Sequence, residues 1–167
     1  YLVRHGKTMF NTIGRAQGWS DTPLTAEGER GIQELGIGLR ESGLQFERAY
    51  SSDSGRTIQT MGIILEELGL TGQIPYRMDK RIREWCFGSF DGAYDGDLFM
   101  GIIPRIFNVD HVHRLSYAEL AEGLVEVDTA GWAEGWEKLS GRIKEGFEAI
   151  AKEMEEQGGG NALVVSH

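Results

Sequence analysis

The chain has 167 residues, of which 26% are charged and 40% hydrophobic, and its formal net charge at pH 7 is −9. This composition is typical of a globular protein with a substantial core, whereas the acidic charge argues against nucleic-acid binding. The single cysteine, Cys86, excludes an internal disulfide. Because no apolar run approaches the roughly 18 residues of a membrane span, we expect a cytoplasmic protein that binds neither membranes nor nucleic acid. Its oligomeric state is left open.

The first half of the chain reads as strand, loop, helix, strand, helix. Residues 1–3 favour a buried strand, after which Gly6 would permit a sharp turn. Turn-forming residues predict a loop over 6–24. A helix is predicted over 26–42, with an N-cap at Thr25, and another over 54–68, with a strand at 48–52 between them. Their apolar faces are predicted to be Ile32, Leu35 and Leu39, and Ile58, Met61, Ile64, Leu65 and Leu68.

The second half begins with a short strand near 74–77 and continues into a stretch, 88–115, with little periodicity. A capping-box pattern starts a helix over 116–126. The strongest helical pattern follows over 130–157, and a last strand begins at 162. The apolar positions of that pattern are Trp132, Trp136, Leu139, Ile143, Phe147, Ile150 and Met154.

Alternating strands and helices predict an α/β fold, a three-layer sandwich with a largely parallel central sheet. We expect a single domain over 1–167, with a helical or irregular insertion at roughly 88–130 over the active site. Because both ends coincide with strands, we also expect further residues beyond Tyr1 and His167.

Three of the predicted strands are each followed by basic or imidazole side chains. These strands and the groups behind them are residues 1–3 with Arg4 and His5, residues 48–52 with Arg56, and residues 162–165 with His167. If the strands are parallel neighbours, these groups meet at the edge of the sheet where ligands bind in α/β proteins. Such a set suits a tetrahedral anion better than a metal, whose sites usually include a carboxylate or thiolate. We therefore expect no metal site.

Each candidate residue also has a structural interpretation. A lone histidine such as His5 is more often structural, although a neutral imidazole with one nitrogen fixed can be a nucleophile. Two nearby guanidiniums would lower its pKa. Arg56 could pair with Asp53 at the surface instead of binding phosphate. Glu84 could serve as a general acid or simply pair with Arg83.

Taken together, the motifs resemble the histidine phosphatase superfamily, the phosphoglycerate mutase-like fold. The resemblance rests on residues 2–6, Asn11, residues 17–25, residues 50–52 with Arg56 and Thr60, Arg83-Glu84 with Phe87-Gly88, and residues 164–167. It runs along the whole chain except for 89–130. The motifs also occur in the order typical of the family.

The resemblance implies that His5 is phosphorylated as the nucleophile and that Glu84 protonates the leaving group. Arg4, Arg56 and His167 would hold the phosphoryl oxygens, a role that suits phosphoryl transfer. Asn11, Gln17 and Gly18 would bind substrate. No cofactor is implied for a metal-independent, acid-type phosphomonoesterase that hydrolyses small phosphate monoesters.

Two departures bear on the alternative, a cofactor-dependent phosphoglycerate mutase. Mutases of this family carry Arg-His-Tyr-Gly after the acid, where this chain has residues 85–88, Trp-Cys-Phe-Gly. They also carry two adjacent arginines in the insertion, whereas Arg105 and Arg114 stand alone here. Both departures favour hydrolysis. A third possibility, from another class, is a protein that binds phosphate esters without turning them over.

Overall fold

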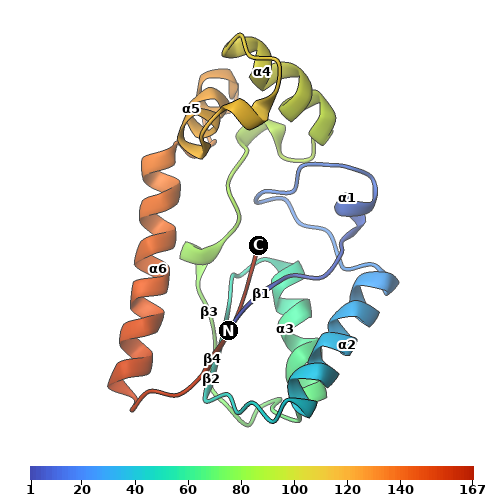
Figure 1. Cartoon of the computed structure of the whole chain (residues 1–167), viewed down its shortest axis with the longest axis vertical. Coiled ribbons are helices and arrows are strands. Elements are labelled where there is room, and N and C mark those ends of the chain that lie inside the picture. The colour runs from blue at the N-terminus through green and yellow to red at the C-terminus, as the bar shows by residue number, and fades with distance from the viewer. The chain divides into compact units, whose positions relative to one another are not determined.

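The computed structural model describes all residues from 1 to 167. The strands are β1 (Leu2–Arg4), β2 (Arg48–Ser51), β3 (Tyr76–Met78) and β4 (Ala162–Ser166). The α-helices are α1 (Met9–Thr12), α2 (Ala26–Glu41), α3 (Gly55–Leu68), α4 (Ile103–Ile106), α5 (Tyr117–Val127) and α6 (Trp136–Glu156) (Figure 1). Shorter helical turns are η1 (Lys80–Ile82), η2 (Gly88–Phe90), η4 (Val112–Arg114) and the π-helical η3 (Gly96–Ile102).

The chain divides into two compact units. The first comprises residues 1–9, 21–83 and 143–167, and the second comprises residues 10–20 and 84–142. All four strands belong to the first unit, and α6 contributes residues to both. The predictions of a single domain and of an insertion over the active site stay predictions.

The first unit is built on a parallel sheet with the strand order β1-β4-β2-β3. The expectation that the three strands with basic residues behind them are parallel neighbours is therefore confirmed. Val165 of β4 lies opposite Val3 of β1 on one side and opposite Ser51 of β2 on the other. The prediction that residues 1–3 form a buried strand is wrong, because β1 is an edge strand on which Leu2 is 65% exposed.

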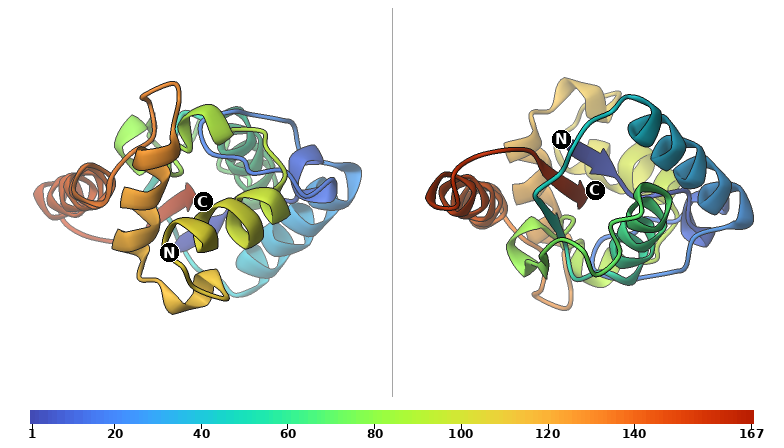
Figure 2. Two further views of the ribbon diagram at one scale, coloured as in Figure 1. Left: turned by 90° about the horizontal axis from the view of Figure 1, so that it is seen from above. Right: turned by 90° about the horizontal axis from the view of Figure 1, so that it is seen from below.

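Alternate side chains of β2 and β4 enter two different cores. Ala49, Leu163 and Val165 pack with α2 and α3, whereas Tyr50 and Val164 pack with the C-terminal part of α6. Seen from below, α2 and α3 lie on one side of the strands and this part of α6 on the other (Figure 2). The predicted three-layer α/β sandwich is confirmed.

Helices α2 and α3 begin and end close to where the sequence predicted. The hydroxyl of Thr25 accepts a hydrogen bond from Gly28 N at 3.1 Å, as an N-cap should. Gly69 ends α3 in the left-handed conformation, at φ 68°. Two of the predicted apolar positions are wrong, because Leu35 and Ile58 are exposed. Gly36 is buried instead, where an added Cβ would lie 2.7 Å from the Cβ of Glu67.

Three other predicted segments differ in detail. The predicted loop over 6–24 contains the one-turn helix α1, and the stretch 88–115 contains η2, η3, α4 and η4. Helix α6 starts at Trp136 rather than near 130. The carboxylate of Asp128 accepts hydrogen bonds from the N–H groups of Ala130, Trp132 and Ala133. Those donors hold residues 130–133 in a turn before the helix, so Trp132 is not part of the helical apolar face.

Candidate active site

In the first unit, His5 and His167 lie at the carboxyl ends of two adjacent strands. His5 follows β1, and its N–H donates to Ser166 O at 3.0 Å, so the ladder between β1 and β4 continues to the site. His167 follows β4 directly. The centroids of the two imidazole rings are 5.3 Å apart. Because strand ends fix both rings, their separation depends on the sheet and not on flexible loops.

His5 is 8% exposed, and its Nδ1–H donates to Gly6 O at 2.8 Å. This bond leaves Nε2 as the ring nitrogen with the lone pair. Burial, and then the charges of Arg56 and Arg4, lower the pKa of His5 from 6.5 to about 4. From the sequence, we predicted that the pKa of His5 is lowered by nearby guanidiniums. The direction is the same here, but desolvation of the ring is the larger cause. His5 is therefore a neutral imidazole at pH 7.

Gly6 adopts no left-handed conformation, contrary to the expectation of a sharp turn that only glycine allows. The requirement for glycine is one of space. An added Cβ would lie 2.8 Å from Cγ1 of Ile32 and 3.1 Å from Gly28 O, both on α2. In addition, Gly6 N donates to the hydroxyl of Thr60 at 3.0 Å. Gly6 thus keeps the chain after His5 close against α2 and α3.

His167 contacts both Arg56 and Ser52. Arg56 Nη2 lies 3.0 Å from His167 Nδ1, and a guanidinium can only donate, so Nδ1 accepts. In the neutral ring, Nε2–H then donates to Ser52 Oγ at 2.8 Å. Ser52 in turn contacts Thr57 Oγ1 at 2.8 Å, at the start of α3. These contacts fix the ring of His167 from two sides.

Arg56 is fully buried, with 0% exposure. Its Nη1 donates to Asp21 Oδ1 at 2.9 Å, and its backbone N–H lies 3.4 Å from the same oxygen. The alternative partner considered from the sequence, Asp53, binds Arg83 instead, at 2.5 and 2.6 Å. Arg83 therefore has a carboxylate partner in Asp53, and its pairing with Glu84 stays a prediction.

Asp21 packs closely on the start of α3, where residue 55 is a glycine. A Cβ at Gly55 would overlap with Asp21 Oδ2. The carboxylate therefore lies at the N-terminus of α3, where a negative charge is favourable. Among the remaining predicted groups, Arg4 is exposed at the end of β1, close enough to lower the pKa of His5.

The other predicted site residues belong to the second unit. Glu84 is half-buried, and its Oε1 accepts a hydrogen bond from Trp85 N at 2.8 Å. Gln17 is buried, and Asn11 lies on the exposed helix α1. The roles of these residues and of Gly18 toward a substrate on His5 stay predictions.

A buried ion pair braces the segment that carries Glu84. Glu134 is 0% exposed and accepts from Arg142 Nε at 2.7 Å and Nη2 at 2.5 Å. Its Oε2 also accepts from Cys86 N at 3.2 Å, and Arg142 Nη2 donates to Glu84 O at 2.7 Å. The backbone on both sides of Trp85 is therefore tied to one rigid pair.

The loop with Gln17 and Gly18 lies against the same segment. Asp91 accepts hydrogen bonds from Gly18 N at 2.8 Å and from Ser20 N at 3.1 Å. A side chain at Gly18 would overlap with Trp85 O. Within the second unit, the structure thus brings the predicted substrate loop next to the predicted acid.

Sequence reasoning missed Asp21, Ser52, Glu134 and Arg142 as supporting residues. Asp21 and Ser52 stood inside the quoted motifs, so their positions were visible but their partners were not. Glu134 and Arg142 carried no local signal, because a buried ion pair eight residues apart looks like any charged helical surface. Their burial is set by tertiary packing alone.

A family model described as the histidine phosphatase superfamily (branch 1) matches residues 1–167. The chain belongs to this superfamily. Its fold and the motifs around His5 agree with that membership.

Solved structures with similar folds include both mutases and phosphatases by name. The crystal structure of phosphoglycerate mutase from Bacillus anthracis str. Sterne has a TM-score of 0.93 and 36% identity, and the match covers 100% of this chain and 73% of that one. A candidate alpha-ribazole-5'-P phosphatase from Escherichia coli str. K-12 substr. MG1655 has a TM-score of 0.71 and 26% identity, with 99% and 71% coverage.

Among curated relatives, the "Probable phosphoglycerate mutase GpmB" of Salmonella choleraesuis (strain SC-B67) is 51% identical over 57 residues. This match covers 34% of the present chain and 26% of that relative. The similarity thus extends over a minority of both chains.

Two further observations concern metal ions and membrane spans. No cluster of three or more histidine, cysteine, aspartate or glutamate side chains is arranged to hold a metal ion. None of the helices combines the length and apolar character that crossing a bilayer requires.

Proposed function

We propose that this superfamily member is a metal-independent phosphatase that hydrolyses small phosphate monoesters through a phosphohistidine on His5. The single observation that carries the proposal is the buried, neutral His5, whose Nδ1 is bound to Gly6 O and whose ring lies beside that of His167. Arg56 donates to His167 and carries a permanent charge. An imidazole nucleophile beside a fixed guanidinium suits attack on a phosphoryl group.

The reaction proceeds in two displacements. In the first, the lone pair of His5 Nε2 forms a bond to phosphorus while the ester P–O bond breaks, and Glu84 gives its proton to the departing alkoxide. In the second, water attacks the phosphohistidine, Glu84 takes a proton from that water, and the N–P bond breaks to release phosphate. Arg4, Arg56 and His167 stabilise the phosphoryl oxygens, and Asn11, Gln17 and Gly18 contact the substrate.

Trapping the intermediate tests the proposal directly. The protein is mixed with a ³²P-labelled phosphate monoester and quenched in alkali, because phosphohistidine is labile in acid. We expect label on wild-type protein and on a His111→Ala control, whose exposed histidine lies in the second unit, but none on His5→Ala. Binding of the ester without label or released phosphate would support the third possibility, a binding protein.

The role of Glu84 is tested by changing the leaving group. Glu84→Gln should lower kcat about 10²-fold or more on alkyl phosphates, which need a proton on the departing oxygen. On p-nitrophenyl phosphate, whose leaving group needs no protonation, the loss should be much smaller. Equal losses on both substrates would show that Glu84 is not the acid.

The phosphoglycerate mutase from Bacillus anthracis makes mutase activity the second candidate. In this chain, Trp85 and Cys86 are buried apolar side chains at the positions where mutases of the family carry arginine and histidine. Arg114 pairs with Asp110 at 3.5 Å, and Arg105 is exposed on α4. Incubation with 3-phosphoglycerate, with and without the bisphosphate, distinguishes the two. We expect release of inorganic phosphate with no bisphosphate requirement, whereas bisphosphate-dependent formation of 2-phosphoglycerate would identify a mutase.

A further inference from the structure

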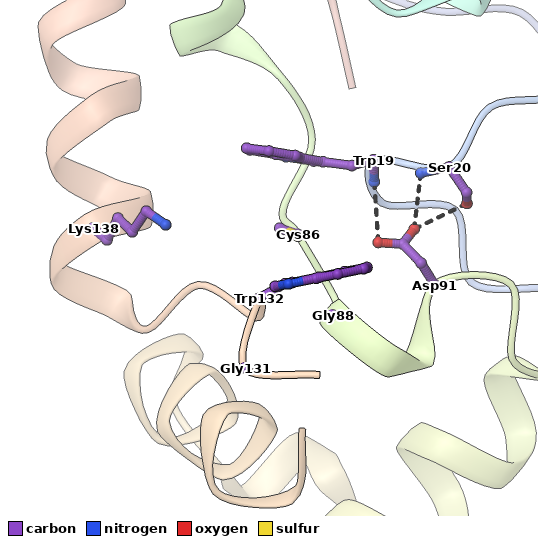
Figure 3. A pocket seen from close by; sticks show the side chains of 8 residues that line it. All are labelled: Trp19, Ser20, Cys86, Gly88, Asp91, Gly131, Trp132 and Lys138. Atoms are coloured by element: carbon purple, nitrogen blue, oxygen red, sulfur yellow. Dashed lines mark hydrogen bonds between the residues drawn. The ribbon is translucent and has the colours of Figure 1, made fainter. Parts of the chain in front are cut away.

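The second unit contains a pocket of about 540 Å³ that the mechanism above does not use. Two tryptophans line it on opposite sides, and in the close view their indole rings are seen edge-on and roughly parallel to each other (Figure 3). Trp19 is 42% exposed and Trp132 is 70% exposed. Two large aromatic side chains that line one cavity form a contiguous apolar surface, which is a feature of ligand-binding sites. The remaining lining residues are Ser20, Cys86, Gly88, Asp91, Gly131 and Lys138.

Both tryptophans are anchored although their faces are open. Trp19 Nε1 donates to Glu84 O at 2.9 Å, and Trp19 N lies 3.3 Å from Asp91 Oδ2. Trp132 N donates to Asp128 Oδ2 at 2.6 Å. Burial alone would raise the pKa of Asp128, but the surrounding N–H donors outweigh it and keep that pKa well below its usual range. The Trp132 turn is therefore held by a permanently charged carboxylate.

The rest of the wall is largely apolar or already hydrogen-bonded. Asp91 accepts from Gly18, Trp19 and Ser20, so its charge is compensated. Burial raises the pKa of Cys86, which keeps its thiol neutral. Lys138 extends from α6 toward the space between the indoles (Figure 3). Two opposed aromatic faces with a neutral thiol between them suit a flat aromatic ring, and the Lys138 ammonium is compatible with such a ring because a cation is attracted to an aromatic face.

The pocket lies against the backbone of the segment that carries the proposed acid, within the same unit. Cys86 follows Glu84 by two residues, and the indole of Trp19 is bonded to the backbone carbonyl of Glu84. A general acid protonates the oxygen of the leaving group, so the organic part of the ester must lie next to the acid. We propose that this pocket binds the leaving alcohol of the substrate and that this alcohol carries a flat aromatic ring stacked between Trp19 and Trp132.

This inference rests on the proposed phosphatase function and names its substrate class, aromatic phosphate monoesters. The test compares 2-phenylethyl phosphate with 2-cyclohexylethyl phosphate, which have the same reacting bond and similar size but differ in planarity. Stacking on an aromatic side chain typically contributes enough affinity for about a tenfold effect or more. We therefore expect wild-type kcat/KM to be about tenfold higher for the phenyl ester.

Trp132→Ala should abolish most of that preference by lowering kcat/KM for the phenyl ester and leaving that for the cyclohexyl ester nearly unchanged. Trp136→Ala is the matched control, because Trp136 is 41% exposed in the same unit and does not line the pocket. It should change neither value. Equal kcat/KM for the two esters in wild type, or equal losses in Trp132→Ala, would overturn the inference.

A binding measurement separates failure of this inference from failure of the proposed function. Calorimetric titration of His5→Ala protein with each ester requires no turnover. Tighter binding of the phenyl ester that Trp132→Ala removes would support the pocket even if no ester were hydrolysed. Hydrolysis of both esters together with equal binding would leave the phosphatase intact and exclude an aromatic subsite.

Discussion

His5 combines two properties that oppose each other in water. In the proposed reaction it must be neutral to attack phosphorus, yet it must lie among cations that attract a dianion. Burial resolves this conflict, because a desolvated imidazole resists protonation at neutral pH even without the guanidiniums. The carbonyl of Gly6 then selects which ring nitrogen keeps its proton.

We expect His5 to make stability fall at acid pH. Its pKa is about 4 in the folded protein and 6.5 ordinarily, so below pH 6.5 the unfolded state takes up a proton that the folded state refuses. Between pH 7.5 and pH 5 this should cost about 2 kcal/mol of unfolding free energy. Urea denaturation at both pH values measures the cost. His5→Gln should show a correspondingly smaller loss, and an unchanged loss would mean that the pKa of His5 is not depressed.

The ion pair between Asp21 and Arg56 should matter more for stability than the pair between Asp53 and Arg83. The Arg56 side chain is 0% exposed and that of Arg83 is 29% exposed, so water can replace a lost carboxylate at Arg83 but not at Arg56. We expect Asp21→Ala to lower the free energy of unfolding by about 2 kcal/mol, and Asp53→Ala by less than about 1 kcal/mol. Urea denaturation at pH 7 compares them, and equal losses would contradict the difference in burial.

Helix α2 contains glycines with opposite consequences. Gly28 lies against the backbone that follows His5, where an added Cβ would approach Lys7 N to 2.8 Å. Gly31, in the same helix, has nothing within 4 Å of an added Cβ. The closeness of α2 to the segment behind β1 therefore depends on Gly28 and Gly6, although helix propensity disfavours both Gly28 and Gly31.

Alanine substitutions in α2 test this distinction. Gly28→Ala should destabilise the protein by about 1–3 kcal/mol, because rigid backbone must move. Gly31→Ala should stabilise it by up to about 1 kcal/mol through helix propensity alone. Thermal unfolding of the two variants gives the sign of each change. A stabilising Gly28→Ala would show that α2 can shift away from residue 7 at little cost.

The two compact units are joined by more than one connection. The chain passes between them after residues 9, 20, 83 and 142, and α6 contributes to both. The four tryptophans all lie in the second unit, whereas all four strands lie in the first. Tryptophan fluorescence therefore reports on the second unit, and the amides of the strands report on the first.

We expect both units to unfold in one transition, because neither is a continuous segment that could fold before the other is made. Tryptophan fluorescence follows the second unit during urea denaturation, and the NMR signals of β4 amides follow the first. Their midpoints should coincide, as two-state unfolding requires. Separate midpoints would show that the units are independently stable.

Local sequence was sufficient to predict helix ends, because the residues that cap a helix lie within a few positions of its end. The Thr25 cap, the Ser116 capping box and the Gly69 stop all placed helix ends correctly, because capping bonds join neighbours along the chain. Alternation of strands and helices also gave the parallel α/β sheet. The burial predicted for residues 1–3, Leu35 and Ile58 was wrong, because the periodicity of apolar residues does not reveal which faces of a strand or helix are covered by other elements.

What the sequence by itself determined is where the candidate reacting groups lie, because His5, Arg56 and His167 each follow a strand that can be recognised locally. What only the tertiary structure decided is their partners: Asp21 for Arg56, Ser52 for His167, and Glu134 with Arg142 behind the segment of Glu84. The tertiary structure alone also places Trp19 and Trp132 on opposite sides of one pocket. Contacts between residues far apart in the chain depend on how the elements pack, and no local pattern encodes that packing.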